Sequence, residues 1–452
     1  MSRALDLAEQ ALRAAEGDEA EVLVHAERSG VARYAGSVVH QPTLVDDAMI
    51  RMRVVRDGKV GWASTNRANG LDELARRASE AADQARADPD FPGLAQPAEY
   101  PSVDGHDPET AELGPEDQAR LAADAIAAAG DFGLYGYFTS ALTQIALASS
   151  TGLSAEQELT DAAVLSLAAT DGASGWAEHT SWRVSDLDPA ATTEEATSKA
   201  ARTRDAQEIE PATYPAVLEP YAVAELLRWF SYDSLGAQGF IEERSYFCNR
   251  VGEKLFDEQV TLTDNGLDPV NFPKSFDFEG TPRRAVTMIE NGVARGVVWD
   301  RMTAARAGDG HESTGHAPPE DWRYYGPLPT AFDLAPGDAA SVDELAERIG
   351  DGIYVTRLHY LGIIDSRGAV LTGMTRDGTF RIRDGKVAEP LVNLRFTVPM
   401  GDVLGEVPGL TRERMLVNLN ELYGERYPFA ALVPALATTK FQITGTGSGP
   451  GL

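Results

Sequence analysis

Residues 47–65 read DAMIRMRVVRDGKVGWAST and predict a β-hairpin. Runs with strand character stand on both sides of the turn Arg56-Asp57-Gly58-Lys59. An Asp-Gly pair between two such runs is typical of a two-residue hairpin turn. The sequence therefore predicts paired antiparallel strands in this part of the chain.

The rest of the first half alternates between predicted helices and strands. Residues 21–27 have strand character, and a series of strands extends to residue 167. Residues 88–109 are rich in Pro, Asp and Gly, so we expect a surface excursion there. We place the main domain boundary near residue 210, which gives an N-terminal α/β domain at residues 1–210. Helical patterns predict helices at residues 1–12, 71–87, 115–129 and 192–206.

The second half, residues 211–452, is poorer in predicted helices and rich in glycine-containing turns. Asp264-Asn265-Gly266 and Glu290-Asn291-Gly292 are two such turns, and the second separates two apolar runs in the manner of a hairpin. Helices are predicted at residues 222–235 and 342–350. The fold class is therefore α+β, with the N-terminal domain followed by a large, β-rich and mostly antiparallel C-terminal domain.

Composition limits the classes of function. The 452 residues carry a formal net charge of −30, which argues against binding to nucleic acid or to an anionic membrane surface. Cys248 is the single cysteine, so no intrachain disulfide can form. The sequence has no signal-peptide pattern and no apolar stretch of about 20 residues, the length needed to cross a bilayer. We expect a soluble cytoplasmic protein.

Five short segments together resemble the TldD/PmbA family of peptidase-related proteins, and the resemblance extends over nearly the whole chain. Their order and spacing, more than any one of them, carry the resemblance. They are residues 57–66 (DGKVGWASTN), 150–154 (STGLS), 214–220 (YPAVLEP), 276–282 (FDFEGTP) and 290–293 (ENGV).

The resemblance implies one of two branches that pair as a heterodimer. One branch resembles a zinc peptidase with an HExxxH motif on the helix after the segment at residues 214–220, and with a cysteine ligand near the C-terminus. In this chain Arg228 occupies the position of the first histidine, Trp229 that of the glutamate and Asp233 that of the second histidine. Zinc hydrolysis needs imidazole ligands and a carboxylate base, so the resemblance is to the non-catalytic TldE/PmbA branch.

A literal HExxxH occurs elsewhere, at His311-Glu312-Ser313-Thr314-Gly315-His316. Two histidines five positions apart on a helix are about 140° apart, so they would meet one ion only across a distorted turn. Glycines and prolines crowd the segment, and we predict a loop. If a metal binds here, Asp309 and His359 are the nearest plausible additional ligands.

These observations predict a subunit that completes a peptide cleft while a TldD-like partner supplies the zinc. No cofactor is expected in this chain, and the peptide is expected to bind as an added strand. Two alternatives stay open: a stand-alone metal-dependent peptidase or biosynthetic enzyme that uses the HExxxH segment, and a non-hydrolytic binding or scaffold protein. The candidate cleft residues are Arg228, Asp233, His311, Glu312 and His316.

Overall fold

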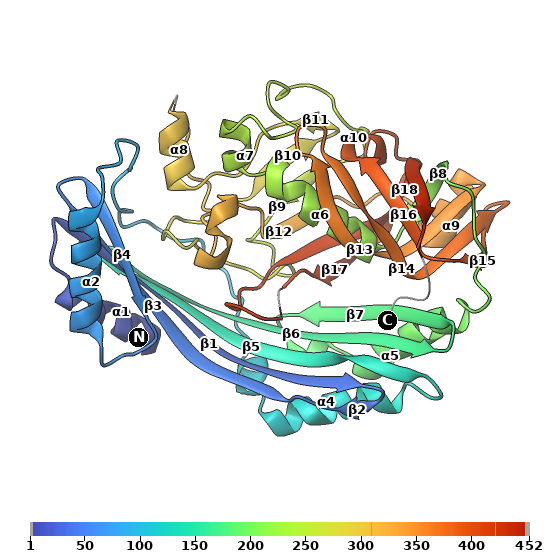
Figure 1. Ribbon diagram of the computed structural model, residues 1–452, viewed down its shortest axis with the longest axis horizontal. Helices are drawn as coiled ribbons and strands as arrows, with labels where there is room; N and C mark the ends of the chain where they lie inside the picture. The colour runs from blue at the N-terminus through green and yellow to red at the C-terminus, as the bar shows by residue number, and fades with distance from the viewer. Residues whose placement is uncertain (1–2, 309, 421, 448–452) are drawn as a thin grey trace.

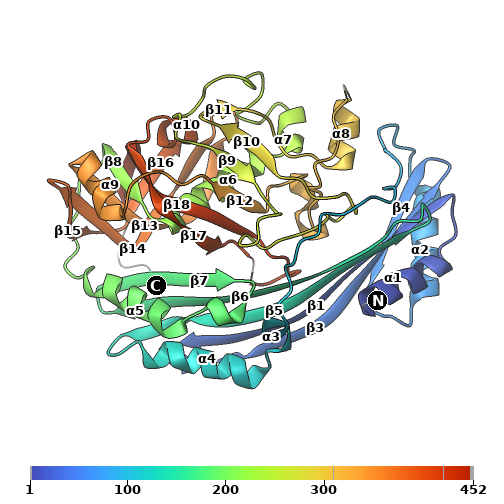
Figure 2. The ribbon, with the colours of Figure 1, turned by 180° about the vertical axis from the view of Figure 1, so that it is seen from behind.

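The computed structural model describes residues 3–308, 310–420 and 422–447. Two β-sheets dominate it, one from each half of the chain. Figure 1 shows the long strands of the first half as a curved layer against which the second half packs, and Figure 2 shows the same two layers from behind. The predicted α+β class, with a β-rich C-terminal half, is confirmed. The domain boundary near residue 210 stays a prediction.

The first sheet is antiparallel throughout its described pairs, in the order β4-β3-β1-β5-β6-β7 with β2 beside β1. The predicted hairpin is confirmed as β3 and β4, which pair up to Arg56 and Lys59 around the turn. Asp57 and Gly58 both have positive φ, as a two-residue hairpin turn requires. The strands are β1 (Glu19–Ala35), β2 (Val38–Val39), β3 (Thr43–Arg56), β4 (Lys59–Thr65), β5 (Gly133–Ser149), β6 (Ser154–Thr170) and β7 (Ala173–Ser181).

Alternation along the strands gives this sheet two different faces. On β1, Val22 and Val24 pack under α1 and α2, whereas Leu23 between them packs toward Phe278 of the second half. Further along β1, Tyr34 packs under α4 and α5. Helices therefore cover the outer face, and the second half covers the inner face (Figure 1). The helices of the first half are α1 (Arg3–Ala14), α2 (Leu71–Gln84), α3 (Pro108–Glu112), α4 (Pro115–Ala127), η1 (Val184–Asp186) and α5 (Pro189–Ala201).

The second sheet runs β11-β10-β9-β12-β18-β16-β14-β13-β8, with β15 beside β14 and β17 beside β18. It is mostly antiparallel; β12 with β18 and β13 with β8 are its parallel pairs among the described residues. β18 also pairs with β8, which closes a ring of strands. The strands are β8 (Thr213–Leu218), β9 (Leu262–Asp264), β10 (Val286–Glu290), β11 (Val293–Ala294), β12 (Ala331–Leu334), β13 (Gly352–Asp365), β14 (Val370–Arg383), β15 (Lys386–Leu391), β16 (Leu394–Pro399), β17 (Gly409–Asn418) and β18 (Ala430–Thr446).

Helix α6 packs in the main core of this half. Leu226, Leu227 and Phe230 belong to the same buried cluster as Val355 of β13 and Phe396 of β16. None of the helices in the described ranges is long and apolar enough to cross a bilayer. The helices here are α6 (Pro220–Ser234), α7 (Ala237–Ile241), α8 (Arg301–Ala307), η2 (Glu320–Tyr325), α9 (Val342–Ile349) and α10 (Met400–Val403).

The predicted helices are present, and the largest shift in position is at α5. It begins at Pro189 instead of residue 192, because the Asp188 side chain caps it by accepting a 2.9 Å hydrogen bond from Ala191 N. The excursion predicted at residues 88–109 forms no helix or strand up to residue 107, and α3 begins within it at Pro108. It is not wholly at the surface, since Leu94 is buried.

Candidate functional site

Helix α6 carries the positions at which the resemblance expects metal ligands. Pro220 lies in its first turn, where a fixed φ suits a helix start. Most of the helix is buried, and its half-buried residues include Arg228, Trp229, Tyr232 and Asp233. Residues four positions apart lie on the same side of a helix, so these side chains share one partly open face. Two of the five predicted cleft residues, Arg228 and Asp233, are thus brought to one surface.

Arg228 is held among aromatic rings. Its Nε donates a 2.8 Å hydrogen bond to Tyr232 Oη, and its guanidinium lies 6.0 Å from the centre of the Phe429 ring. Trp229 packs edge-on against Tyr232, with ring centres 5.5 Å apart. Arg228 and Tyr232 face a pocket of about 290 Å³. Its other lining residues are Asp321, Trp322, Tyr324, Tyr325, Leu328, Tyr423 and Phe429.

Asp233 is engaged by two neighbours. Its carboxylate forms an ion pair with Arg244 and accepts a 2.6 Å hydrogen bond from Ser366 Oγ. Each oxygen therefore already has a donor. A cationic guanidinium, an indole and a paired carboxylate are a donor set that does not fit a zinc ion, which takes neutral imidazole, thiolate or free carboxylate ligands.

The HExxxH segment forms a loop, as predicted, and no helix occurs at residues 310–316. Gly310 has φ 80°, a conformation that glycine adopts without strain. His311 is exposed and stacks on Trp299, with ring centres 4.2 Å apart. Glu312 is also exposed. The His311 and Glu312 side chains thus lie at the surface.

His316 points into the core, and only 1% of its surface is exposed. Its Nε2 lies 3.0 Å from Asp264 Oδ1, and its Nδ1 lies 2.9 Å from Thr314 Oγ1. Burial and the nearby Arg283 guanidinium lower the pKa of His316 to about 4, so the ring is neutral near pH 7. Both ring nitrogens are occupied by protein partners.

The described residues contain no group of three or more His, Cys, Asp or Glu side chains that could hold a metal ion. Asp309, one of the additional ligands suggested by the sequence, lies outside the described residues. His359, the other, is on β13 and packs against Tyr360, with ring centres 4.3 Å apart. Burial and the neighbouring Arg357 lower the pKa of His359 to about 4.

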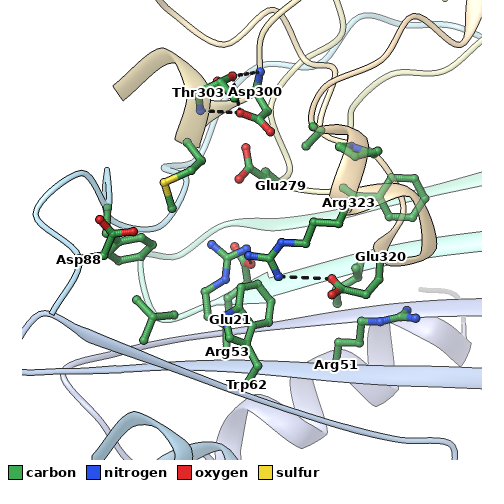
Figure 3. Close-up of a pocket in the computed structure, with 18 of the residues that line it drawn as sticks. Glu21, Arg51, Arg53, Trp62, Asp88, Glu279, Asp300, Thr303, Glu320 and Arg323 are labelled. Carbon is green, nitrogen blue, oxygen red and sulfur yellow. Dashed lines mark hydrogen bonds and ion pairs between the residues drawn. The ribbon is translucent and has the colours of Figure 1, made fainter. Parts of the chain in front are cut away.

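A pocket of about 370 Å³ lies where the inner face of the first sheet meets the second half (Figure 3). Its floor includes one row across three strands: Glu21 of β1 pairs with Arg53 of β3, which pairs with Trp62 of β4. Because directly paired residues point to the same face, all three side chains face the second half. Arg53 Nη2 lies 3.5 Å from Glu21 Oε1, and the Arg53 guanidinium lies 4.1 Å from the centre of the Trp62 ring.

The roof of this pocket comes from the second half. Glu279 lies in the turn closed by the β-bridge between Phe276 and Pro282, Asp300 caps α8, and Arg323 belongs to η2. Figure 3 shows the carboxylates of Glu279 and Asp300 near each other, and Arg323 reaching down toward the floor. The Arg323 guanidinium lies 4.5 Å from the centre of the Trp62 ring. One aromatic ring of the floor therefore meets an arginine from each half of the chain.

The pKa values of two acids in this pocket are raised. Burial raises the pKa of Glu21 despite the neighbouring Arg53. Burial, together with the negative charges of Asp300 and Asp277, raises the pKa of Glu279 to about 8. Perturbed acids in a cavity mark candidate binding sites. This pocket is therefore a second candidate site, separate from α6.

None of the five predicted cleft residues is among the described residues that line this pocket. Sequence reasoning missed it, although Trp62 and Glu279 fall within two of the segments that carried the family resemblance. Glu21 stands in a predicted strand, where its acidic side chain could have drawn attention. About 260 residues separate Trp62 from Arg323, and no local pattern indicates that they meet.

Comparisons with known proteins agree on one family. The profile described as PmbA/TldA metallopeptidase C-terminal domain matches residues 211–445, and the one described as PmbA/TldA metallopeptidase domain 1 matches residues 20–82. An uncharacterized protein of Methanocaldococcus jannaschii is 33% identical over 22% of this chain and 24% of its own length. A metalloprotease of Methanothermobacter thermautotrophicus is 26% identical over 88% of both chains.

A solved structure extends the likeness to the whole fold. The crystal structure of TldE from Thermococcus kodakarensis superimposes with a TM-score of 0.85 and 20% sequence identity. The match covers 97% of this chain and 99% of that one. At this identity the likeness concerns the fold alone.

Proposed function

Because the chain belongs to the PmbA/TldA metallopeptidase family, we propose that it is the TldE-type, non-catalytic subunit of a heterodimeric zinc peptidase. A TldD-type partner supplies the zinc, the glutamate base and the attacking water. This chain completes and encloses the cleft in which unfolded or modified precursor peptides are cleaved.

The observation that carries this proposal is the chemistry of the three side chains at the motif positions on α6. Arg228 would repel a divalent cation, and it is packed among aromatic rings. Trp229 has no basic oxygen to accept a proton from a metal-bound water. Asp233 is already paired with Arg244. None of the three positions supplies the chemistry that the peptidase branch requires there.

The literal HExxxH segment gives the alternative enzyme little support. His311 is exposed and stacked on Trp299, whereas His316 is buried and bonded to Asp264. The two imidazoles thus face different environments. To reach one ion, the segment would have to break the buried His316 contacts.

Peptide binding by strand addition needs a sheet edge. β4 ends the strand order of the first sheet, and within the described residues only β3 pairs with it as a strand. An added strand is held mainly by backbone hydrogen bonds, which make little demand on the peptide sequence. This suits a subunit that handles unfolded peptides of varied sequence. The β4 edge is our proposed position for the peptide.

The test combines metal analysis with peptide cleavage. The chain is purified alone and after mixing with a zinc-bearing TldD-type relative from the same source, and zinc per chain and cleavage of an unfolded peptide are measured. We expect no stoichiometric zinc in the chain alone, and cleavage that needs the mixture. About one zinc per chain with activity alone would refute the subunit role, and His316→Ala would then test the loop. No gain on mixing would favour a scaffold protein.

A further inference from the structure

The roof of the pocket in Figure 3 carries two carboxylates without a cation. Asp300 Oδ1 accepts hydrogen bonds from Thr303 N (2.7 Å) and Thr303 Oγ1 (2.6 Å), and Glu279 Oε2 accepts one from Arg301 N (2.9 Å). Within the described part of the chain, no ion pair joins Glu279 or Asp300 to a basic side chain. Burial and the charge of Asp300 raise the pKa of Glu279 to about 8, so this acid is mostly protonated near neutral pH, and a positive charge placed beside the two acids would favour its ionised form.

The charges at the floor are of the opposite sign: two guanidinium groups, one from the floor and one that reaches down from the roof, lie on one aromatic ring. Arg53 and Arg323 lie 4.1 and 4.5 Å from the centre of the Trp62 ring. Arg53 pairs with Glu21, and Arg323 with Glu320, each at 3.5 Å. Charge-assisted hydrogen bonds are shorter, roughly 2.7–2.9 Å. Both guanidiniums therefore keep donor capacity for an anion.

The guanidinium of Arg53 on the floor keeps a buried donor without a hydrogen bond. Arg53 Nε has no partner in the structure. Glu21 beside it is only 4% exposed, and its carboxylate pairs with Arg53 at 3.5 Å. Buried polar groups are normally satisfied, and an exception calls for an explanation. A polar ligand in the pocket would provide one.

The pocket also has room and apolar walls for such a ligand. Its volume of about 370 Å³ lies within the range of roughly 300–1,000 Å³ that small-molecule sites occupy. Leu23, Val60, Phe278 and Met302 contribute apolar surface between the charged ends.

We propose that this pocket binds a short zwitterionic peptide, a dipeptide or tripeptide with both ends free. Its ammonium group lies against Glu279 and Asp300, and its carboxylate against Arg53 and Arg323. The site uses neither α6 nor a partner subunit, so it goes beyond the proposed function and does not depend on it.

A ligand with one kind of charge fits the pocket less well. A phosphate would satisfy the guanidiniums of Arg53 and Arg323 but would face the carboxylates of Glu279 and Asp300. A diamine would satisfy the carboxylates but would face the guanidiniums. A ligand with one charge of each sign meets both ends, and like-charge contacts of either kind are costly.

The test measures binding to the full chain by isothermal titration calorimetry. The probes are Ala-Ala and Ala-Ala-Ala, their N-acetyl, C-amide and doubly capped forms, inorganic phosphate and 1,4-diaminobutane. Each lost charge-assisted contact is expected to weaken binding about tenfold or more. The free peptides should therefore bind, each single cap should weaken binding about tenfold, and a double cap should abolish it.

Two variants address the two ends of the ligand. Glu279→Gln should weaken Ala-Ala binding about tenfold and leave binding of the N-acetyl form unchanged. Arg323→Gln should also weaken Ala-Ala binding about tenfold, but it should leave binding of the C-amide form unchanged. Glu290→Gln and Arg295→Gln are the matched controls, since these two residues form an exposed ion pair and do not line the pocket. Both controls should bind Ala-Ala as the native chain does.

Three results would overturn the proposal: equal binding of free and doubly capped peptides, binding of phosphate or diamine only, or no binding of any probe by a chain that melts cooperatively. Thermal melts of each variant show whether it is folded. Because the binding test uses the chain alone, its outcome is separate from that of the cleavage test on the mixture.

Discussion

The open face of α6 and the pocket of Figure 3 both carry charged side chains near the surface of the second half, but those side chains differ in what they contact. On α6, Arg228 is bonded to Tyr232, and Asp233 is paired with Arg244. In the pocket, no ion pair joins Glu279 or Asp300 to a basic side chain among the described residues, although the charge of Arg53 lowers the pKa of Glu279 in part. The first site has its charges used by the fold, whereas the second has charges that a ligand can still use.

The largest expected effect tests whether the charged groups around the HExxxH loop stabilise the fold, as those on α6 do. Asp264→Asn removes the carboxylate that pairs with Arg283 Nη2 at 2.9 Å and meets His316 Nε2 at 3.0 Å. It leaves the buried Arg283 charge uncompensated, which typically costs about 3–5 kcal/mol. We expect a loss of that size in the free energy of unfolding, measured by urea denaturation, with Glu290→Gln as the control. A loss below about 1 kcal/mol would mean that this cluster is not structural.

The acid–base state of Asp264 gives the same experiment a pH dependence. Burial raises the pKa of Asp264, but Arg283 and His316 lower it by more than burial raises it. The net pKa therefore lies well below the usual range. A depressed pKa contributes stability that is present above the unfolded value and is lost as pH falls through the folded one. The deficit of Asp264→Asn should therefore be full at neutral pH.

A smaller loss is expected on α6. Asp233→Ala removes an ion pair with Arg244 and a 2.6 Å hydrogen bond from Ser366 Oγ. Partly exposed contacts of this kind are worth about 1–2 kcal/mol together. The urea midpoint should fall accordingly, and the zinc content of the chain should not change. A drop in bound zinc would show that Asp233 serves a metal and would break the contrast between the two sites.

The smallest expected effect has the opposite sign. Glu279→Gln removes a carboxylate whose pKa is raised from 4.5 to about 8 by burial and the neighbouring Asp300. Such an acid contributes stability below its unfolded pKa and loses it as pH rises toward the folded one. The variant should match the native chain near pH 4.5 and exceed its stability by about 1 kcal/mol near pH 5.5, one pH unit above the unfolded pKa. Equal or lower stability at pH 8 would show that Glu279 has a partner in the fold.

The fold was largely predictable because its signals are local. The Asp57-Gly58 turn predicted the β3–β4 hairpin, and the position of α6 followed from its helical pattern. The start of α5 was missed because the Asp188 cap outweighed the helix propensity used to place it. Local patterns predict elements better than their ends.

The sites were less predictable because their contacts are not local. The loop around His311 was predicted from its glycines, but the burial of His316 depends on Asp264, 52 positions away. The pocket depends on Trp62 meeting Arg323 and on Glu21 facing Glu279 across the two halves. The motif comparison identified the residues that differ at α6. Which charged side chains lack an ion pair depends on contacts between distant residues, and these contacts are known only from the structure.

The pairing of the two halves has a consequence for the order of synthesis. Trp62, the last of the floor residues Glu21, Arg53 and Trp62, leaves the ribosome about 260 residues before Arg323, the last of the roof residues named above. At roughly 5–20 residues per second, this is a delay of about 10–50 s. During that time the inner face of the nascent sheet has no cover, and its charged row keeps it hydrated. A purely apolar face exposed for as long would invite aggregation, so the mixed charges of the floor also protect the growing chain.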